Sequence, residues 1–202
     1  MTDGADARLV PAREGRGEVR EKASRFFGIA APAASTAEAE GILARIRREH
    51  HDATHVAFAW KIGSGDRTSA RASDAGEPGG TAGRPIAGAI ESAGLSDVVV
   101  AVVRYYGGTR LGTGGLVRCY REAASLALAA CGSRTVYETI RLEARPTHAG
   151  SGAVRRLLRP PEVRLLSERF DPEPVLELEV RRTLADGIID ALTEARIAVR
   201  RL

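Results

Sequence analysis

Apolar residues recur with a helical period in three stretches of the first two thirds of the chain. In the first stretch, Ile42, Leu43 and Ile46 lie on one helical face, and Glu38 stands three residues after Ser35, which is the spacing of a capping box. The other two stretches each follow a glycine-rich loop. The pattern therefore predicts helices over 35–50, 85–94 and 114–130.

Stretches of strand-like composition separate these helices and predict strands over 8–13, 17–30, 55–62, 67–73 and 97–104. The first two flank the sequence EGRG, so we expect an opening hairpin that turns at residues 14–17. The nearly unbroken valine run from Val98 to Val103 predicts a buried strand.

The pattern changes after Thr135. It predicts a strand over 136–145, a helix over 148–158, strands over 163–170 and 175–182, a helix over 184–195 and a strand over 197–202. This β-α-β-β-α-β order is that of ferredoxin-like domains. We therefore expect an α+β protein of two domains, residues 1–134 and 135–202.

Composition and charge narrow the class of protein without identifying it. The chain has 202 residues, 44% of them apolar, with 30 basic and 26 acidic residues and a net charge of +4. This charge permits nucleic-acid binding but does not indicate it. No run of eighteen apolar residues and no signal-peptide pattern is present, so we expect a soluble cytoplasmic protein without membrane contact. Cys119 and Cys131 are expected to be buried thiols, because their separation along one helix, about 18 Å, exceeds disulfide reach.

Two glycine-rich loops, DAGEPGGTAG and YYGGTRLGTGG, carry the candidate functional residues. The second lacks the lysine of a P-loop, and Val117 occupies the third glycine position of a Rossmann fingerprint, so both nucleotide cradles are excluded. Free N–H groups at the start of the following helix could still hold an anion such as a nucleic-acid phosphate. The candidate binding residues are Arg104, Tyr105, Tyr106, Arg110, Arg118 and Arg121. From the residues alone, the favoured interpretation is that the glycines only allow tight turns and that the arginines are solvated or paired.

Asp74 and Glu77 form the other candidate site. Two carboxylates in such a loop could bind Mg²⁺ or act as acid and base, but the favoured interpretation is that Asp74 stabilises the turn and Glu77 accepts hydrogen bonds from loop amides. His50, His51 and His55 lack a fourth ligand at a recognised spacing. We therefore expect no metal, no cofactor and no catalytic residue.

Four segments of the chain resemble, in order and spacing, the YigZ/IMPACT family, whose first domain is called the Impact N-terminal domain. They are EKASRF, HHDATHVAFAW, SDAGEPGGTAGRP and VVAVVRYYGGTRLGTGGLVRCY, and the match spans roughly residues 17–130. The family motif places its loop residues at Asp74, Gly76, Glu77, Pro78, Thr81, Gly83, Gly107, Gly108, Gly112, Gly114 and Gly115. Ala75 replaces the second aspartate of the usual motif, which weakens any proposal of a metal site with three carboxylates.

The resemblance implies a ribosomal protein S5 domain 2-like domain followed by a ferredoxin-like domain, as in the bacterial branch of the family. Eukaryotic relatives are translational regulators that act through protein contacts, and bacterial members have been suggested to bind nucleic acid or the ribosome. The favoured hypothesis is a non-enzymatic, translation-linked regulatory factor whose partner is RNA, the ribosome or a translation-associated protein. The alternative is a small-molecule enzyme, hydrolase-like, that uses Asp74 and Glu77 near a glycine-rich anion-binding loop. No oligomeric state is predicted.

Overall fold

The structure, a computed structural model, describes residues 6–202 in two compact units. One comprises residues 8–135, and the other comprises residues 6–7 together with 136–202. The start of the sequence, on which the expectation of no signal peptide partly depends, lies outside the described residues. No helix within residues 6–202 is long and apolar enough to span a membrane.

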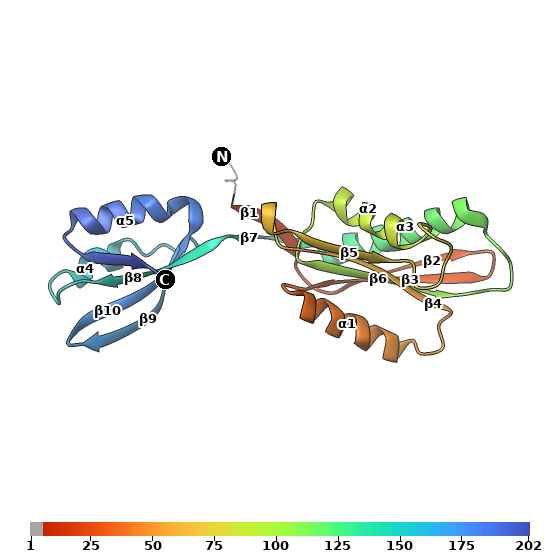
Figure 1. Cartoon of the computed structure of the whole chain (residues 1–202), viewed down its shortest axis with the longest axis horizontal. Helices are drawn as coiled ribbons and strands as arrows, with labels where there is room; N and C mark the ends of the chain where they lie inside the picture. Colours follow the sequence, from red (N-terminus) through yellow and green to blue (C-terminus); the bar gives the residue numbers. More distant parts are fainter. Residues whose placement is uncertain (1–5) are drawn as a thin grey trace. The chain divides into compact units, whose positions relative to one another are not determined.

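The unit of residues 8–135 is built on an antiparallel sheet with helices on both faces. Its five strands lie in the order β2 (Gly15–Glu21), β3 (Ser24–Pro32), β6 (Val98–Tyr105), β4 (His55–Ile62) and β5 (Ser69–Ser73). Helix α1 (Thr36–Glu49) covers one face, and α2 (Gly83–Ala93) and α3 (Gly112–Cys131) cover the other (Figure 1).

The central strand β6 explains the unbroken valine run. Val98, Val100 and Val102 pack against α2 and α3, whereas Val99 and Val103 pack on the side of α1. Because both faces of the strand are covered here, every position from Val98 to Val103 is apolar. The prediction of a buried strand is confirmed.

The helix signals in the sequence also hold. Ser35 caps α1 by accepting a hydrogen bond from the Glu38 N–H at 3.2 Å, and Glu38 accepts one from the Ala34 N–H at 2.9 Å. Helix α2 ends at Gly94, whose φ of +65° is left-handed. Helix α3 contains both cysteines, which are free and buried, and burial raises the pKa of each thiol.

The predicted opening hairpin is wrong. β1 (Ala7–Pro11) pairs with β7 (Ser133–Tyr137) instead of β2, and the first hairpin joins β2 to β3. Its turn lies at Lys22 and Ala23, which both have positive φ, at 44° and 60°. Two consecutive left-handed residues match the twist of a two-residue hairpin, although neither is the usual glycine or asparagine.

The C-terminal unit has the predicted β-α-β-β-α-β order. Its elements are β8 (Thr139–Arg145), α4 (Ser151–Arg156), β9 (Val163–Asp171), β10 (Glu173–Arg181), α5 (Ala185–Glu194) and β11 (Ala198–Arg201). A short 3-10 helix, Arg182–Leu184, precedes α5, and the unit of residues 8–135 has one at Gly65–Arg67. The strands form an antiparallel sheet in the order β11-β8-β10-β9, and α4 and α5 cover one face over a shared apolar core (Figure 1).

The strand predicted over 136–145 is interrupted at Glu138. The Glu138 N–H donates to the Asp6 carbonyl at 2.8 Å, and its own carbonyl accepts from the Arg182 N–H at 2.7 Å. The Asp6 carboxylate in turn accepts hydrogen bonds from Arg181 and Thr183. Burial alone would raise the pKa of Asp6, but these partners lower it to about 2. These contacts bring Asp6 into the C-terminal unit.

Candidate functional site

Asp74 holds the first glycine-rich loop in place. Its Oδ1 accepts hydrogen bonds from the backbone N–H groups of Ala82 and Gly83 at 2.9 and 2.8 Å, and its Oδ2 accepts one from Gly80 at 2.8 Å. Burial by itself raises the pKa of this carboxyl, but the three amide hydrogen bonds outweigh burial and hold the pKa below its ordinary value. Asp74 is therefore an ionised cap at the start of α2, in agreement with its interpretation as a turn-stabilising residue.

Backbone geometry accounts for the other motif residues of this loop. Gly76 has a φ of +89°, which favours glycine. The Thr81 hydroxyl donates to the Pro78 carbonyl at 2.7 Å. A Cβ on Gly83 would lie 2.8 Å from backbone atoms of Ser73, so only glycine fits where the first residue of α2 contacts the last residue of β5. These positions shape the loop.

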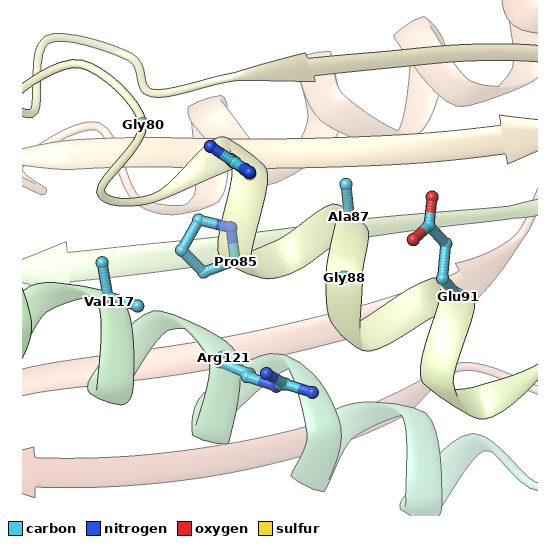
Figure 2. A pocket seen from close by; sticks show the side chains of 8 residues that line it. Gly80, Pro85, Ala87, Gly88, Glu91, Val117 and Arg121 are labelled. Carbon is cyan, nitrogen blue, oxygen red and sulfur yellow. The ribbon is translucent and has the colours of Figure 1, made fainter.

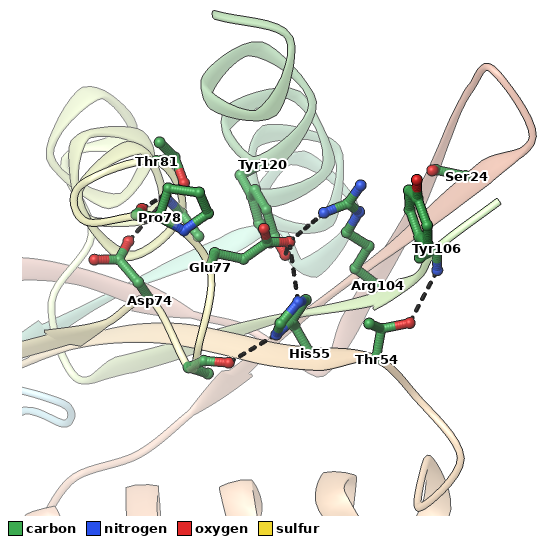
Figure 3. A network of polar contacts seen from close by, with 12 residues as sticks. Ser24, Thr54, His55, Asp74, Glu77, Pro78, Thr81, Arg104, Tyr106 and Tyr120 are labelled. Carbon is green, nitrogen blue, oxygen red and sulfur yellow. Dashed lines mark hydrogen bonds and ion pairs between the residues drawn. The ribbon is translucent and has the colours of Figure 1, made fainter. Parts of the chain in front are cut away.

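Glu77 is buried and binds side chains. Its Oε1 accepts hydrogen bonds from Arg104 Nη1 at 2.6 Å and from the Tyr120 hydroxyl at 2.7 Å, and His55 Nε2 lies 3.9 Å away (Figure 3). The side chains of Glu77 and Arg104 are 3% and 7% exposed. The expectation that Glu77 accepts from loop amides is therefore wrong, because β6 and α3 supply side-chain donors instead. Burial, and then the bond to Glu77, raises the pKa of Tyr120, which remains a protonated donor.

Arg104 lies between two aromatic rings. Its guanidinium carbon is 5.4 Å from the centre of the Phe26 ring and 5.3 Å from that of Tyr106. Its Nε is buried and has no hydrogen-bond partner within residues 6–202. Arg104 was predicted as part of an open binding surface, but the structure buries most of it, because Glu77 supplies the opposite charge that burial requires.

The second glycine-rich loop needs glycine for two different reasons. A Cβ on Gly107 would lie 2.2 Å from the carbonyl carbon of Ala23, so the loop passes directly over the β2–β3 turn. Gly108 and Gly112 have φ values of +84° and +72°. The backbone conformation that connects β6 to α3 therefore favours glycine at these three positions.

The start of α3 is uncapped. Leu111 occupies the N-cap position without a side-chain hydrogen bond to the helix, and the first turn carries no acidic residue. A Cβ on Gly114 meets nothing within 4 Å, whereas one on Gly115 would touch Leu111 at 3.0 Å. The first N–H groups of a helix have no partner within the helix itself, so this end of α3 favours an anion.

A pocket of about 550 Å³ opens beside this helix start. Its lining includes His55, Glu77, Arg104, Tyr106 and Arg110. The start of β4, the first glycine-rich loop, the end of β6 and the first turn of α3 therefore meet around one space. Of the six predicted binding residues, Arg104, Tyr106 and Arg110 line it.

Tyr105 and Tyr106 diverge, as neighbours in an extended chain do. The Tyr105 hydroxyl donates to Asp52 Oδ1 at 3.1 Å and lies 3.0 Å from His50 Nδ1, on the side of α1. Tyr106 is 44% exposed, and its N–H donates to the Thr54 hydroxyl at 3.0 Å (Figure 3). Only Tyr106 therefore offers a ring to a ligand in the pocket.

Arg118 and Arg121 lie further along α3, away from this pocket. Arg118 forms an ion pair with Glu21 at 2.9 Å. Arg121 lines a different groove, between α2 and α3, together with Val117 and residues of α2 (Figure 2). The six predicted residues thus do not share one exposed face.

No group of three or more histidine, cysteine, aspartate or glutamate side chains within residues 6–202 is arranged to hold a metal ion. The clustered histidines of the sequence diverge: His50 contacts Tyr105, whereas His55 Nδ1 lies 2.9 Å from the Ala75 carbonyl. Residue types at sequence spacing alone could not show this divergence.

The sequence did not predict Thr54 and Tyr120 as residues of the site, and it considered His55 only as a metal ligand. The available signal was their presence inside the motif segments HHDATHVAFAW and GGLVRCY. Tyr120 lies on the buried face of α3, and its hydroxyl finds the partner that a buried tyrosine needs in Glu77, which only the fold reveals.

Comparisons with known proteins agree with the motifs. The Impact N-terminal domain model matches residues 22–128. A Thermus thermophilus protein described as an IMPACT family member is 46% identical over 136 residues, 67% of this chain and 72% of that protein. The Haemophilus influenzae IMPACT family member is 33% identical over 187 residues, 92% of this chain and 91% of that protein. A crystal structure described as that of a hypothetical protein has a TM-score of 0.71 at 25% identity and covers 98% of both chains. This chain belongs to the IMPACT family.

Proposed function

We propose that this protein is a non-enzymatic, translation-linked regulatory factor that acts in the cytoplasm by binding, with RNA, alone or in the ribosome, as the partner that its site fits best. The proposal is supported by membership of the IMPACT family, because the sequence resemblance implies that relatives in this family are translational regulators. The observation that carries the proposal is the pocket at the start of α3, which joins two arginines, an exposed tyrosine and uncapped helix N–H groups.

The alternative of a hydrolase lacks a free acid-base pair. Asp74 accepts three amide hydrogen bonds, and Glu77 is bound to Arg104 and Tyr120. A general base must reach a substrate proton, and neither carboxylate is available for that. Both motif acids instead stabilise the loop and the pocket wall.

RNA is favoured over a protein partner because of the chemistry of the pocket. Arginine binds phosphate through paired hydrogen bonds, a helix start adds N–H donors, and an exposed tyrosine ring can stack on a base. We further propose that residues 8–135 form an S5 domain 2-like domain and that the C-terminal unit is a ferredoxin-like domain. The boundary that the sequence predicts, between domains 1–134 and 135–202, lies one residue before this division.

Ribosome co-sedimentation and binding to short single-stranded RNA at several salt concentrations test the function. We expect salt-sensitive binding, and replacing Arg110 by alanine should reduce the slope of log affinity against log salt by about 0.7, the value for one phosphate contact on a single strand. Arg48→Ala is the matched control, because Arg48 is exposed on α1 at the other face of the sheet. Absence of both RNA and ribosome binding at low salt would refute the proposal.

A further inference from the structure

The pocket at the start of α3 contains a buried cation whose hydrogen-bonding capacity is mostly unused. Arg104 makes one side-chain hydrogen bond within residues 6–202, to Glu77, although a guanidinium carries five N–H donors. Glu77 divides its acceptor capacity between Arg104 and Tyr120. A buried polar nitrogen without a partner is rare in folded proteins, and the unpaired Nε shows that Glu77 and Tyr120 do not complete the surroundings of Arg104. The same side chain lines the pocket, so its remaining donors can serve a ligand there.

The balance of charge in this pocket favours an anion. Arg104 and Arg110 contribute two positive charges and Glu77 one negative charge. The start of α3 adds roughly half a positive charge, and no acidic residue of its first turn cancels it. An anion placed among these groups could accept paired hydrogen bonds from the Arg110 guanidinium, together with hydrogen bonds from the remaining Arg104 donors and from the N–H groups at the start of α3.

The remaining walls fit a planar, weakly polar group. Pro78, Leu111 and Leu116 line the pocket together with Tyr106, whose ring is held over Arg104. A ring fixed in this way can stack on a base without losing much conformational freedom. At about 550 Å³ the space falls within the range of small-ligand pockets.

We propose that this pocket binds a nucleotide that carries a phosphate monoester, with the phosphate at the start of α3 between Arg110 and Arg104 and the base on Tyr106. The inference rests on the proposed function, RNA binding, because the nucleotide bound here can be the phosphorylated end of an RNA strand. A free mononucleotide presents the same chemistry. A monoester fits better than an internal diester, because it offers three free oxygens and nearly two negative charges to these donors.

Calorimetric titration of the full chain with adenosine 5′-monophosphate and with adenosine tests the chemistry. We expect the monophosphate to bind about tenfold more tightly or better, the effect of one hydrogen bond between charged groups. Arg110→Ala should remove this preference, whereas Arg48→Ala should leave it unchanged. Amide NMR spectra should show the largest phosphate-dependent shifts at Gly112 and Thr113. Equal affinity for the two probes, or a preference that survives Arg110→Ala, would overturn the proposal.

A second pair of probes separates the two sources of the nucleotide. A short RNA with a 5′-phosphate should bind about tenfold more tightly than the same RNA with a 5′-hydroxyl if strand ends enter the pocket. A preference seen only with the free monophosphate supports the site and assigns it to a mononucleotide. If RNA binds but neither the 5′-phosphate of the RNA nor that of the monophosphate improves affinity, the site is refuted and the proposed function remains intact. If the monophosphate binds but RNA and ribosomes do not, the site is supported and the proposed function is refuted.

Discussion

Replacement of Glu77 by glutamine tests the buried pair at the centre of the site. Glutamine keeps the shape and an oxygen acceptor for Arg104 and Tyr120 but removes the charge. At an effective dielectric constant of about 20, two unit charges at the observed N–O distance of 2.6 Å attract by about 6 kcal/mol. The retained neutral hydrogen bond offsets roughly 1–2 kcal/mol of this loss, whereas the contacts of Arg104 with the two rings are the same in both proteins and do not enter the difference. We therefore expect the free energy of unfolding to fall by about 4 kcal/mol, within the range for breaking a buried pair.

The assay is urea unfolding followed by tryptophan fluorescence. Trp60, the one tryptophan of the chain, lies in β4, so its signal reports the unit of residues 8–135. Glu40→Gln is the control, because the Glu40–Arg71 pair is exposed and should contribute less than about 1 kcal/mol.

A double variant measures the coupling directly. Combining Glu77→Gln with Arg104→Met should cost clearly less than the sum of the two single changes, because the double variant leaves no unpaired charge in the core. Additive costs, or a Glu77→Gln variant no less stable than Glu40→Gln, would refute our account of this pair.

Two further changes test the backbone and the C-terminal unit. Gly107→Ala should destabilise the protein by about 3 kcal/mol, because its Cβ would lie 2.2 Å from the backbone of Ala23. Gly88→Ala is the control: its Cβ meets open space, so it should stabilise α2 by up to about 1 kcal/mol. Equal melting temperatures for the two variants would contradict this reasoning. Asp6→Asn should cost about 2 kcal/mol at neutral pH, since the folded pKa of about 2 lies below the ordinary aspartate value of 3.8. Stability from the Asp6–Arg181 pair should be complete above about pH 4 and lost as pH falls towards 2. Unfolding followed by circular dichroism measures the stability difference between the wild type and Asp6→Asn at each pH. If this difference does not change between about pH 4 and pH 2, the pair is not its cause.

Local signals predicted much of the fold. The cap at Ser35, the stop at Gly94 and the valine run of β6 each depend on residues close in sequence, and each is present in the structure. The β2–β3 turn was missed because Lys22 and Ala23 rarely adopt the left-handed conformation, so EGRG gave the stronger turn signal.

The site was less predictable for a physical reason. An arginine after a run of valines indicates the exposed end of a strand, unless a buried carboxylate neutralises it. That carboxylate is Glu77, 27 residues earlier, and the hydroxyl that completes the group is 43 residues from Glu77. Pairings over such separations follow from strand order, which residue spacing does not determine.

The contact between Asp6 and Arg181 has a consequence for the order in which the protein can fold during synthesis. The two residues are 175 positions apart, so Asp6 leaves the ribosome long before its partner exists. The unit of residues 8–135 can form as soon as its own chain has emerged. Asp6 must then remain accessible until β10 is made, and a fragment of residues 136–202 translated alone would lack the carboxylate that neutralises Arg181.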